Sequence, residues 1–196
     1  MRRSSIIIMK SLLLLSALTI TSLVCSCSTG IDIPKGTSKG YQSARLIEYN
    51  PDAEVTDDAA AVVREKKAHA MIHKALSEEF SSHGITYGKS NADLTVAYLV
   101  MIQNNAITFH YNDYFGKGRD ADAITDYAHL KGAIRSKRNE FFERAIIVVD
   151  VIDTKTNNLI FRNHYAKDTI DKPTDAQRNQ RIQAAVKEAL APFFKK

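Results

Sequence analysis

The sequence has only two cysteines among its 196 residues, Cys25 and Cys27, and none follows them. A disulfide framework, a thiolate metal site and a cysteine nucleophile are therefore excluded from the long remainder of the chain. The sequence also lacks a G-x-S-x-G elbow, a glycine-rich phosphate loop and an H-E-x-x-H pattern. It consequently offers no motif for a catalytic centre, a metal or a cofactor, and we expect no enzymatic activity.

The sequence also lacks an apolar run long enough to cross a membrane. Its longest such run extends from Ser11 to Val24 and follows the basic residues Arg2, Arg3 and Lys10. A spanning helix needs about 20 apolar residues, whereas a basic start before a shorter run is typical of a secretory signal peptide. We therefore predict a signal peptide over residues 1–26, with a transmembrane anchor as the weaker alternative.

The end of this run, Val24-Cys25-Ser26-Cys27, resembles the lipobox of bacterial lipoproteins. The resemblance implies that a cysteine is acylated and becomes the first residue of the mature protein. Ser26 supplies the small residue expected before an acylated Cys27, whereas bulkier residues precede Cys25. Two alternatives stay open: a secreted protein cut near Ser28 without lipid, and translation from Met9.

Little net charge remains once this segment is removed. The formal net charge of the whole chain is +5, and loss of Arg2, Arg3 and Lys10 lowers it to +2. A nucleic-acid-binding surface usually shows a much stronger basic excess. We therefore expect no nucleic-acid partner, and we expect a membrane association through the lipid on Cys27.

Residues 27–40 are rich in Ser, Thr, Gly and Lys, a composition that predicts a flexible tether behind the lipidated cysteine. Residues 41–196 have the length of one domain with a sizeable core. Within them, apolar residues recur at helical spacing from Ala61 to Phe80, where Gly84 and Ile85 are typical of a helix end. A second amphipathic helix follows a capping box at Thr174–Gln177.

We expect a first short strand at 41–48, ended by Asn50-Pro51. Alternating side chains predict strands at 94–102 and 107–111. Two further β-rich runs, 144–153 and 159–165, flank a short polar turn and predict a hairpin. Residues 114–138 are charged and contain glycines, which favours a long loop with a short helix near 123–130. We therefore predict an α+β two-layer sandwich, with two amphipathic helices on one face of a mostly antiparallel sheet of four to five strands.

A family resemblance covers roughly Gly40 to the C-terminus. It is carried by Asn91-Ala92-Asp93-Leu94-Thr95-Val96-Ala97-Tyr98, by the run from Ile147 to Thr156, and by Leu159-Ile160-Phe161-Arg162. These segments are similar to the uncharacterised bacterial lipoprotein family known as domain of unknown function four-one-three-six. The family commonly has Trp where Phe161 stands, and its loop is richer in glycine and aromatic residues than 114–138. The resemblance implies a fold and a cell-envelope location, but no catalytic residues.

Three groups of residues could carry chemistry. His69 and His73 have the helical spacing of a metal pair, although two histidines at the edge of an apolar stripe explain them better. Asp150 lies in an apolar strand, where a carboxylate needs a partner such as Arg162 or His164. A structural salt link is the favoured explanation, and a hydrolase using Asp150 with His164 or Arg162 is the alternative. A possible binding surface comprises Tyr114, Phe115, Arg135 and Arg138.

These observations predict an envelope lipoprotein anchored through Cys27, at the periplasmic face of the outer membrane. We expect a non-enzymatic binding or assembly module with an envelope protein partner. A carrier of a hydrophobic ligand is a further alternative, and it requires an apolar cavity between the helices and the sheet. The sequence indicates neither the partner nor the oligomeric state.

Overall fold

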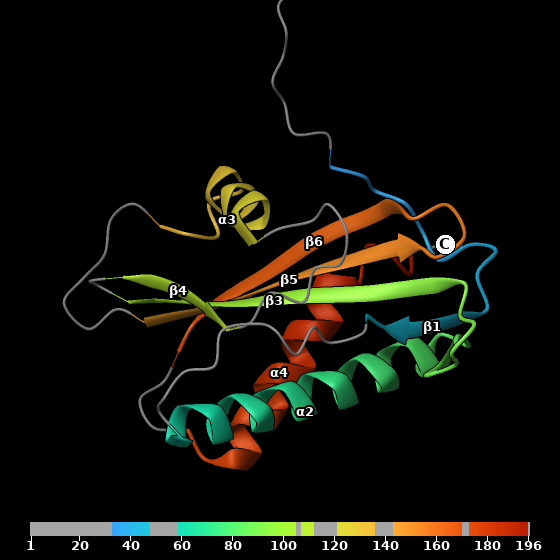
Figure 1. The fold of residues 1–196 in the computed structure, drawn as a ribbon. Coiled ribbons are helices and arrows are strands. Elements are labelled where there is room, and N and C mark those ends of the chain that lie inside the picture. Colours follow the sequence, from blue (N-terminus) through green and yellow to red (C-terminus); the bar gives the residue numbers. More distant parts are fainter. Residues whose placement is uncertain are drawn as a thin grey trace, which may run out of the picture. The chain divides into compact units, whose positions relative to one another are not determined.

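The computed structural model describes residues 33–47, 59–104, 107–111, 121–135, 143–169 and 173–195. In this part of the chain, helices lie on both faces of one sheet (Figure 1). The elements are β1 (Ser43–Leu46), α2 (Ala59–Ser82), β2 (Thr86–Tyr87), β3 (Leu94–Asn104), β4 (Thr108–Tyr111), α3 (Ala121–Leu130), β5 (Glu143–Asp153), β6 (Asn158–Asp168) and α4 (Asp175–Leu190).

The sheet is centred on two long antiparallel strands, β3 and β5. Its order is β2-β1-β3-β5-β6, and β4 pairs with the far half of β3, at Val100–Gln103. Only the pairings of β1 with β2 and with β3 are parallel. The predicted hairpin is confirmed as β5 and β6, with Asn157 in the left-handed region (φ 56°) at the turn. The described residues thus form six strands, β2 being the short one that the sequence did not predict.

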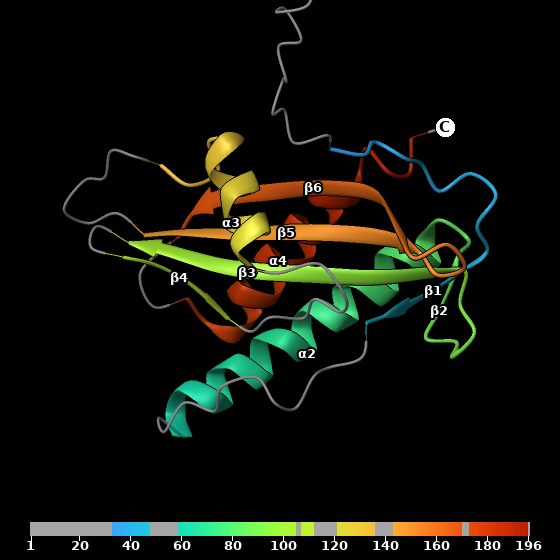
Figure 2. The same cartoon turned by 45° about the horizontal axis from the view of Figure 1, so that its top comes forward.

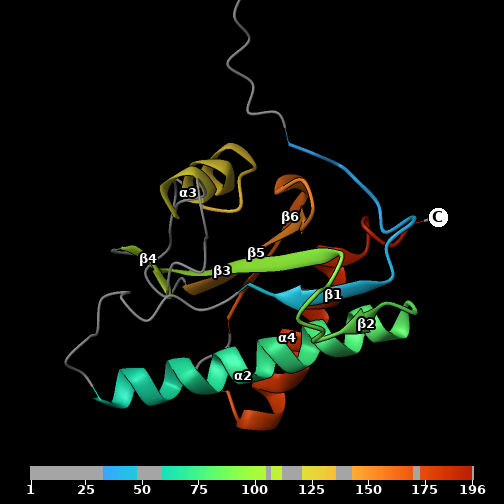
Figure 3. The ribbon, with the colours of Figure 1, turned by 45° about the vertical axis from the view of Figure 1, so that its right-hand side comes forward.

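The two predicted amphipathic helices, α2 and α4, cover one face of this sheet (Figures 1 and 3). Helix α2 ends as expected, because Gly84 has a φ of +79° and the Ile85 amide donates to the Phe80 carbonyl oxygen at 3.0 Å. Helix α4 begins with the predicted capping box, in which Thr174 and Gln177 exchange hydrogen bonds. The main core lies between these helices and the sheet. It consists of Ala44, Ile72, Ala75, Leu76, Phe80, Ile85, Leu94, Val96, Tyr98, Ile147, Val149, Val151, Phe161, Val186, Ala189, Leu190, Phe193 and Phe194.

Helix α3 lies on the opposite face, above β3, β5 and β6 in Figure 2. It confirms the short helix expected within residues 114–138 and starts two residues earlier. Three residues at helical spacing on α3 are buried against the sheet: Ile124, Tyr127 and Ala128. The strand residues that face them are Leu99, Met101, Ile146 and Val148. The prediction of an α+β fold with a mostly antiparallel sheet is confirmed, and α3 gives the sheet a second packed face.

The flexible tether predicted over residues 27–40 is wrong for its second half. Residues 33–40 run along β6 and toward the end of the chain, where Lys35 forms a β-bridge with Phe161. The Gly36 amide donates to the Ile160 oxygen at 2.7 Å, and the Ser38 amide to the Phe193 oxygen at 2.9 Å. These backbone bonds fix the segment, which we call the N-terminal strap (residues 33–40). The prediction failed because composition does not reveal that a strand edge is available for pairing.

None of the helices in the described ranges is both long and apolar enough to serve as a membrane span. Cys27 and the predicted signal peptide lie outside the described residues.

Candidate functional site

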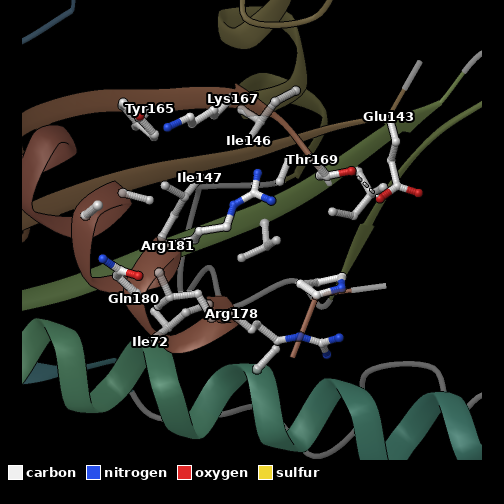
Figure 4. A pocket seen from close by; sticks show the side chains of 18 residues that line it. Ile72, Glu143, Ile146, Ile147, Tyr165, Lys167, Thr169, Arg178, Gln180 and Arg181 are labelled. Carbon is white, nitrogen blue, oxygen red and sulfur yellow. Dashed lines mark hydrogen bonds between the residues drawn. The ribbon is translucent and has the colours of Figure 1, made fainter. Parts of the chain in front are cut away.

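A cavity of about 570 Å³ lies between the sheet and the helices α2 and α4 (Figure 4). Its volume is within the range of roughly 300–1,000 Å³ that is common for small-molecule sites. Residues from α2, α4 and the strands β3, β5 and β6, together with Thr169 and Pro173 between β6 and α4, line it. They are Ala68, Ile72, Val100, Ile102, Glu143, Ala145, Ile146, Ile147, Tyr165, Lys167, Thr169, Pro173, Arg178, Gln180, Arg181, Ile182, Ala184 and Ala185.

The cavity lies next to the parts of the two helices that contribute no fully buried residue to the main core. The main core takes its first residue from α2 at Ile72 and its first residue from α4 at Val186. Before these positions, alanines such as Ala68 and Ala185 face the sheet, and they are too small to fill the space. Close packing, which is the rule in protein interiors, is therefore lost at this end of the sandwich.

The strands give the cavity a gradient from apolar to charged. Side chains on one face of a strand alternate, so Tyr165 and Lys167 of β6 share the face that lines the cavity, and Thr169 follows just after the strand. Along this row the lining changes from a half-buried aromatic ring near the main core to an exposed ammonium group. At the outer end, Thr169 donates its hydroxyl hydrogen to Glu143 Oε1 at 2.8 Å. The inner end of the cavity is therefore apolar and its outer end polar.

Three cationic side chains line this cavity: Lys167, Arg178 and Arg181. In Figure 4, Arg181 extends from α4 beneath the sheet and Arg178 extends on the side of α2. Arg181 Nη2 donates to the backbone oxygen of Asp168 at 2.7 Å. Within the part of the chain that the structure describes, none of the three forms an ion pair with a carboxylate.

The carboxylates nearest to these cations are engaged elsewhere. Asp168 accepts from Arg144 Nη1 at 2.7 Å and lies 3.5 Å from Arg135 Nη1. Asp175, at the start of α4, is paired with Lys67 of α2, and this pair, with a smaller effect of the charge of Arg178, lowers the pKa of its carboxyl group. Among the described lining residues, three cations face one carboxylate, Glu143, which gives the outer end of the cavity a positive potential.

The residues of the predicted salt link meet on the other face of the sheet. Arg162 donates from Nε and Nη2 to the two oxygens of Asp150, at 2.7 Å each, in a buried bidentate pair. Burial alone would lower the pKa of Arg162, but the hydrogen bonds and charge of Asp150 outweigh it and raise that pKa. The structural explanation that we favoured for Asp150 is therefore confirmed by its geometry.

His164 lies beside this pair but bonds to another residue. The Tyr127 hydroxyl is 3.1 Å from His164 Nδ1, and the Arg162 guanidinium carbon lies 5.7 Å from the centre of the Tyr127 ring. Burial, followed by the charges of Lys131 and Arg144, lowers the pKa of His164. Neither Asp150 nor His164 lines the cavity. The residues proposed for a hydrolase are therefore close together, but Asp150 is enclosed and held by Arg162.

The other candidate residues are not brought into one site. His69 Nδ1 is 2.6 Å from the Tyr98 hydroxyl, whereas the ring of His73 lies against that of Tyr87. No group of three potential metal ligands occurs among the described residues. Arg135 exchanges backbone hydrogen bonds with the buried Gln103 side chain. Tyr114, Phe115 and Arg138 lie outside the described residues, so the binding surface predicted around them stays a prediction.

Sequence reasoning did not identify the cavity, although it named the condition for a ligand carrier that the cavity meets. A signal was present in the first half of α4, where Arg178 and Arg181 precede Ile182 on one helical face. Basic residues on the inner face of a helix indicate either a buried ion pair or a site for an anion. Asp175 lies three residues before Arg178, so the sequence alone left both explanations open.

Comparison with solved structures gives distant similarities only. A PelC dodecamer variant from Paraburkholderia phytofirmans has 9% sequence identity and a TM-score of 0.42, with 84% of this chain and 96% of that chain covered. A second PelC dodecamer structure from that organism has 9% identity and a TM-score of 0.41, covering 86% and 96%. A PDZ domain protein from Parabacteroides distasonis has 9% identity and a TM-score of 0.42, covering 80% and 33%. Nothing about function follows from similarities this low.

No curated protein matches the sequence. A family model, in contrast, matches residues 40–193, the span over which the sequence resemblance extends. The chain therefore belongs to the family described as Domain of unknown function (DUF4136).

Proposed function

We propose that this protein is a non-enzymatic, lipid-anchored protein of the bacterial envelope that binds a hydrophobic ligand between its sheet and its two long helices. The observation that carries the proposal is the cavity of about 570 Å³ next to the main core. Apolar side chains that include Ile72, Val100 and Ile182 line its inner end. Such a lining favours apolar ligands, because each buried methylene contributes about 0.8 kcal/mol.

The polar residues of the domain support a binding protein better than a hydrolase. A catalytic carboxylate must reach the proton that it transfers. Asp150 is fully buried, and Arg162 holds both of its oxygens. The cavity itself contains one carboxylate, Glu143, which accepts a hydrogen bond from Thr169. Among the described lining residues there is thus no second carboxylate to pair with Glu143 as acid and base.

The proposed location rests on the sequence before the domain. Val24-Cys25-Ser26-Cys27 fits an acylation site, and the following Ser28 fits transfer to the outer membrane in lipoproteins of this kind. A ligand-binding domain held there would act next to a bilayer, which is a source of hydrophobic molecules. An envelope protein that inserts an apolar side chain into the same cavity is the alternative partner.

Binding of the neutral dye N-phenyl-naphthylamine tests the cavity. We expect saturable fluorescence enhancement with the wild-type protein and a loss of most of it in Ala68→Leu, which fills the cavity from α2. The matched control is Ala70→Leu, two residues along α2 on its exposed side. Equal dye binding by both variants, with unchanged melting temperatures, would show that the dye lies elsewhere and would refute a ligand site in this cavity.

The anchor is tested separately in cells. We expect radiolabelled palmitate to be incorporated into the wild-type protein and not into a Cys27→Ser variant. A Cys25→Ser variant is the control, because Cys25 is the poorer acylation site of the two. An unmodified protein that enters the aqueous phase after detergent partitioning would contradict the anchored location, without affecting the proposal for the cavity.

A further inference from the structure

We propose that the ligand is an anionic amphiphile with a single hydrocarbon chain, whose carboxylate or phosphate headgroup binds Arg178 and Arg181 at the outer end of the cavity. This inference rests on the proposed function and specifies the chemistry of its ligand. It follows from the polarity gradient of the cavity and from three cations that form no ion pair with a carboxylate among the described residues.

The inner half of the cavity fits a hydrocarbon chain. Val100, Ile182 and Ala185 line it and also pack against the main core, so the space continues the apolar interior of the domain. The chain would lie between β3 and α4 and remove apolar surface from water on all sides. A volume of about 570 Å³ suits one chain, whereas two chains with a headgroup would need a larger space.

The outer half fits an anion. Arg178 and Arg181 are half-buried, whereas Lys167 is exposed. A guanidinium group in a partly desolvated site binds carboxylate or phosphate through paired, charge-assisted hydrogen bonds. Arg181 uses one donor on the Asp168 backbone oxygen and has others available. Its position at that oxygen also orients the side chain beneath the sheet, as Figure 4 shows.

The local carboxylates favour an external anion over an internal one. Asp168 is held by Arg144, and Asp175 is held by Lys67 of α2. These pairs leave Arg181 without a carboxylate partner among the described residues, and Arg178 shares the charge of Asp175 with Lys67. The pair of Lys67 and Asp175 also joins α2 to α4, because the two residues lie on different helices. This ion pair therefore lies beside the proposed headgroup site.

Calorimetric titration with ligands of equal chain length tests the headgroup. Laurate, lauryl alcohol and lauryl amine share one hydrocarbon chain and differ in charge. We expect laurate to bind about tenfold more tightly than the alcohol, because one charge-assisted pair strengthens the affinity by about that factor. The amine should bind most weakly, because its charge has the same sign as the site. The preference for laurate should fall as salt is raised, since the site is only partly buried.

Arginine variants then locate the contact. The double variant Arg178→Gln with Arg181→Gln should reduce laurate affinity to that of the alcohol and leave alcohol binding unchanged. Arg181→Lys should retain part of the preference. The matched control is Lys187→Gln, which removes an exposed cation from the same helix outside the cavity. Melting temperatures of all variants check that the fold is intact.

The outcomes separate this inference from the proposed function. Equal affinities for laurate and lauryl alcohol in the wild-type protein would overturn the anionic headgroup and leave a neutral hydrophobic ligand in place. A laurate preference that survives the double arginine variant would also overturn it, because the anion would then bind elsewhere. Failure of all three ligands and of the neutral dye to bind would overturn the proposed function itself.

Discussion

Arg162 and Asp150 are cross-strand neighbours on β6 and β5, and their side chains form a bidentate ion pair with both N–O distances at 2.7 Å. Asp150 has no exposed surface and Arg162 is 8% exposed. The pair lies on the face that α3 covers, where Tyr127 packs against the guanidinium group. Each charge is therefore tolerated in the interior only because the other is present.

Removal of one member of this pair should destabilise the domain strongly. In Asp150→Ala the guanidinium group of Arg162 stays buried without its partner, and we expect a loss of about 3–5 kcal/mol in the free energy of unfolding. The double variant Asp150→Leu with Arg162→Met replaces both charges by apolar groups and should lose much less. Urea unfolding measures both. A single variant within about 1 kcal/mol of the wild type would show that the pair is not buried in solution.

Asp93 should hold β1 against β3 at the start of the sheet. Its Oδ2 accepts from the Gln42 amide and from the amide and hydroxyl of Ser43, at 2.9–3.0 Å, and these bonds lower the pKa of Asp93. We expect Asp93→Ala to lower the melting temperature and to speed hydrogen exchange at Ser43. Asp122→Ala, at an exposed position on α3, is the control. Unchanged exchange at Ser43 would contradict this role.

The lowered pKa also gives the direction of the acid response. The ordinary value for this carboxyl group is 3.8. Because the folded form binds the proton less readily, the stability contributed by Asp93 is present above that value and is lost as the pH falls below it. The Asp93→Ala variant should therefore lose less of its remaining stability than the wild type over this acid range.

The N-terminal strap should depend on the absence of a side chain at Gly36. A Cβ atom at this position would lie 2.5 Å from the backbone oxygen of Ile160, which also accepts the Gly36 amide. We expect Gly36→Ala to detach the strap from β6 or shift the strand, at a cost of about 1–3 kcal/mol. Thr37→Ala, at the exposed neighbour, is the control. Limited proteolysis should cut the Gly36→Ala variant faster within residues 33–40, and equal cutting would contradict the contact.

The predictable parts of this fold are those in which local patterns agree with the tertiary structure. The hairpin of β5 and β6, the end of α2 at Gly84 and the capping box at Thr174 each depend on residues within a few positions. The need of Asp150 for a partner was also predictable, because a carboxylate within an apolar strand requires one, but the choice between Arg162 and His164 came from the structure.

The remaining parts depend on contacts between distant segments. The strap is ordered by the edge of β6, about 125 residues later in the chain, and its composition resembles that of a free linker. The cavity is lined by residues from α2, β3, β5, β6 and α4, so no single segment of the sequence encodes it. The parallel β2 is too short to produce an alternating pattern of its own.

The contact between Tyr127 and His164 should make the attachment of α3 sensitive to pH. Burial, with Lys131 and Arg144 nearby, lowers the pKa of His164 from its ordinary value of 6.5. The unfolded chain therefore takes up a proton as the pH falls through about 6.5, while the folded protein resists it. Stability should be greatest above this pH and should decrease as the pH falls toward the lower, folded-state pKa.

A substitution series separates this histidine from the carboxylates that respond at lower pH. In His164→Gln, which retains a polar side chain, we expect the melting temperature to change less between neutral pH and pH about 5 than in the wild type. His129→Gln, at an exposed position on α3, controls for loss of a histidine as such. Hydrogen exchange at Ala128 and its neighbours should report the loosening of α3 directly. If the wild type and His164→Gln lose stability equally over this range, His164 is not the group that takes up the proton.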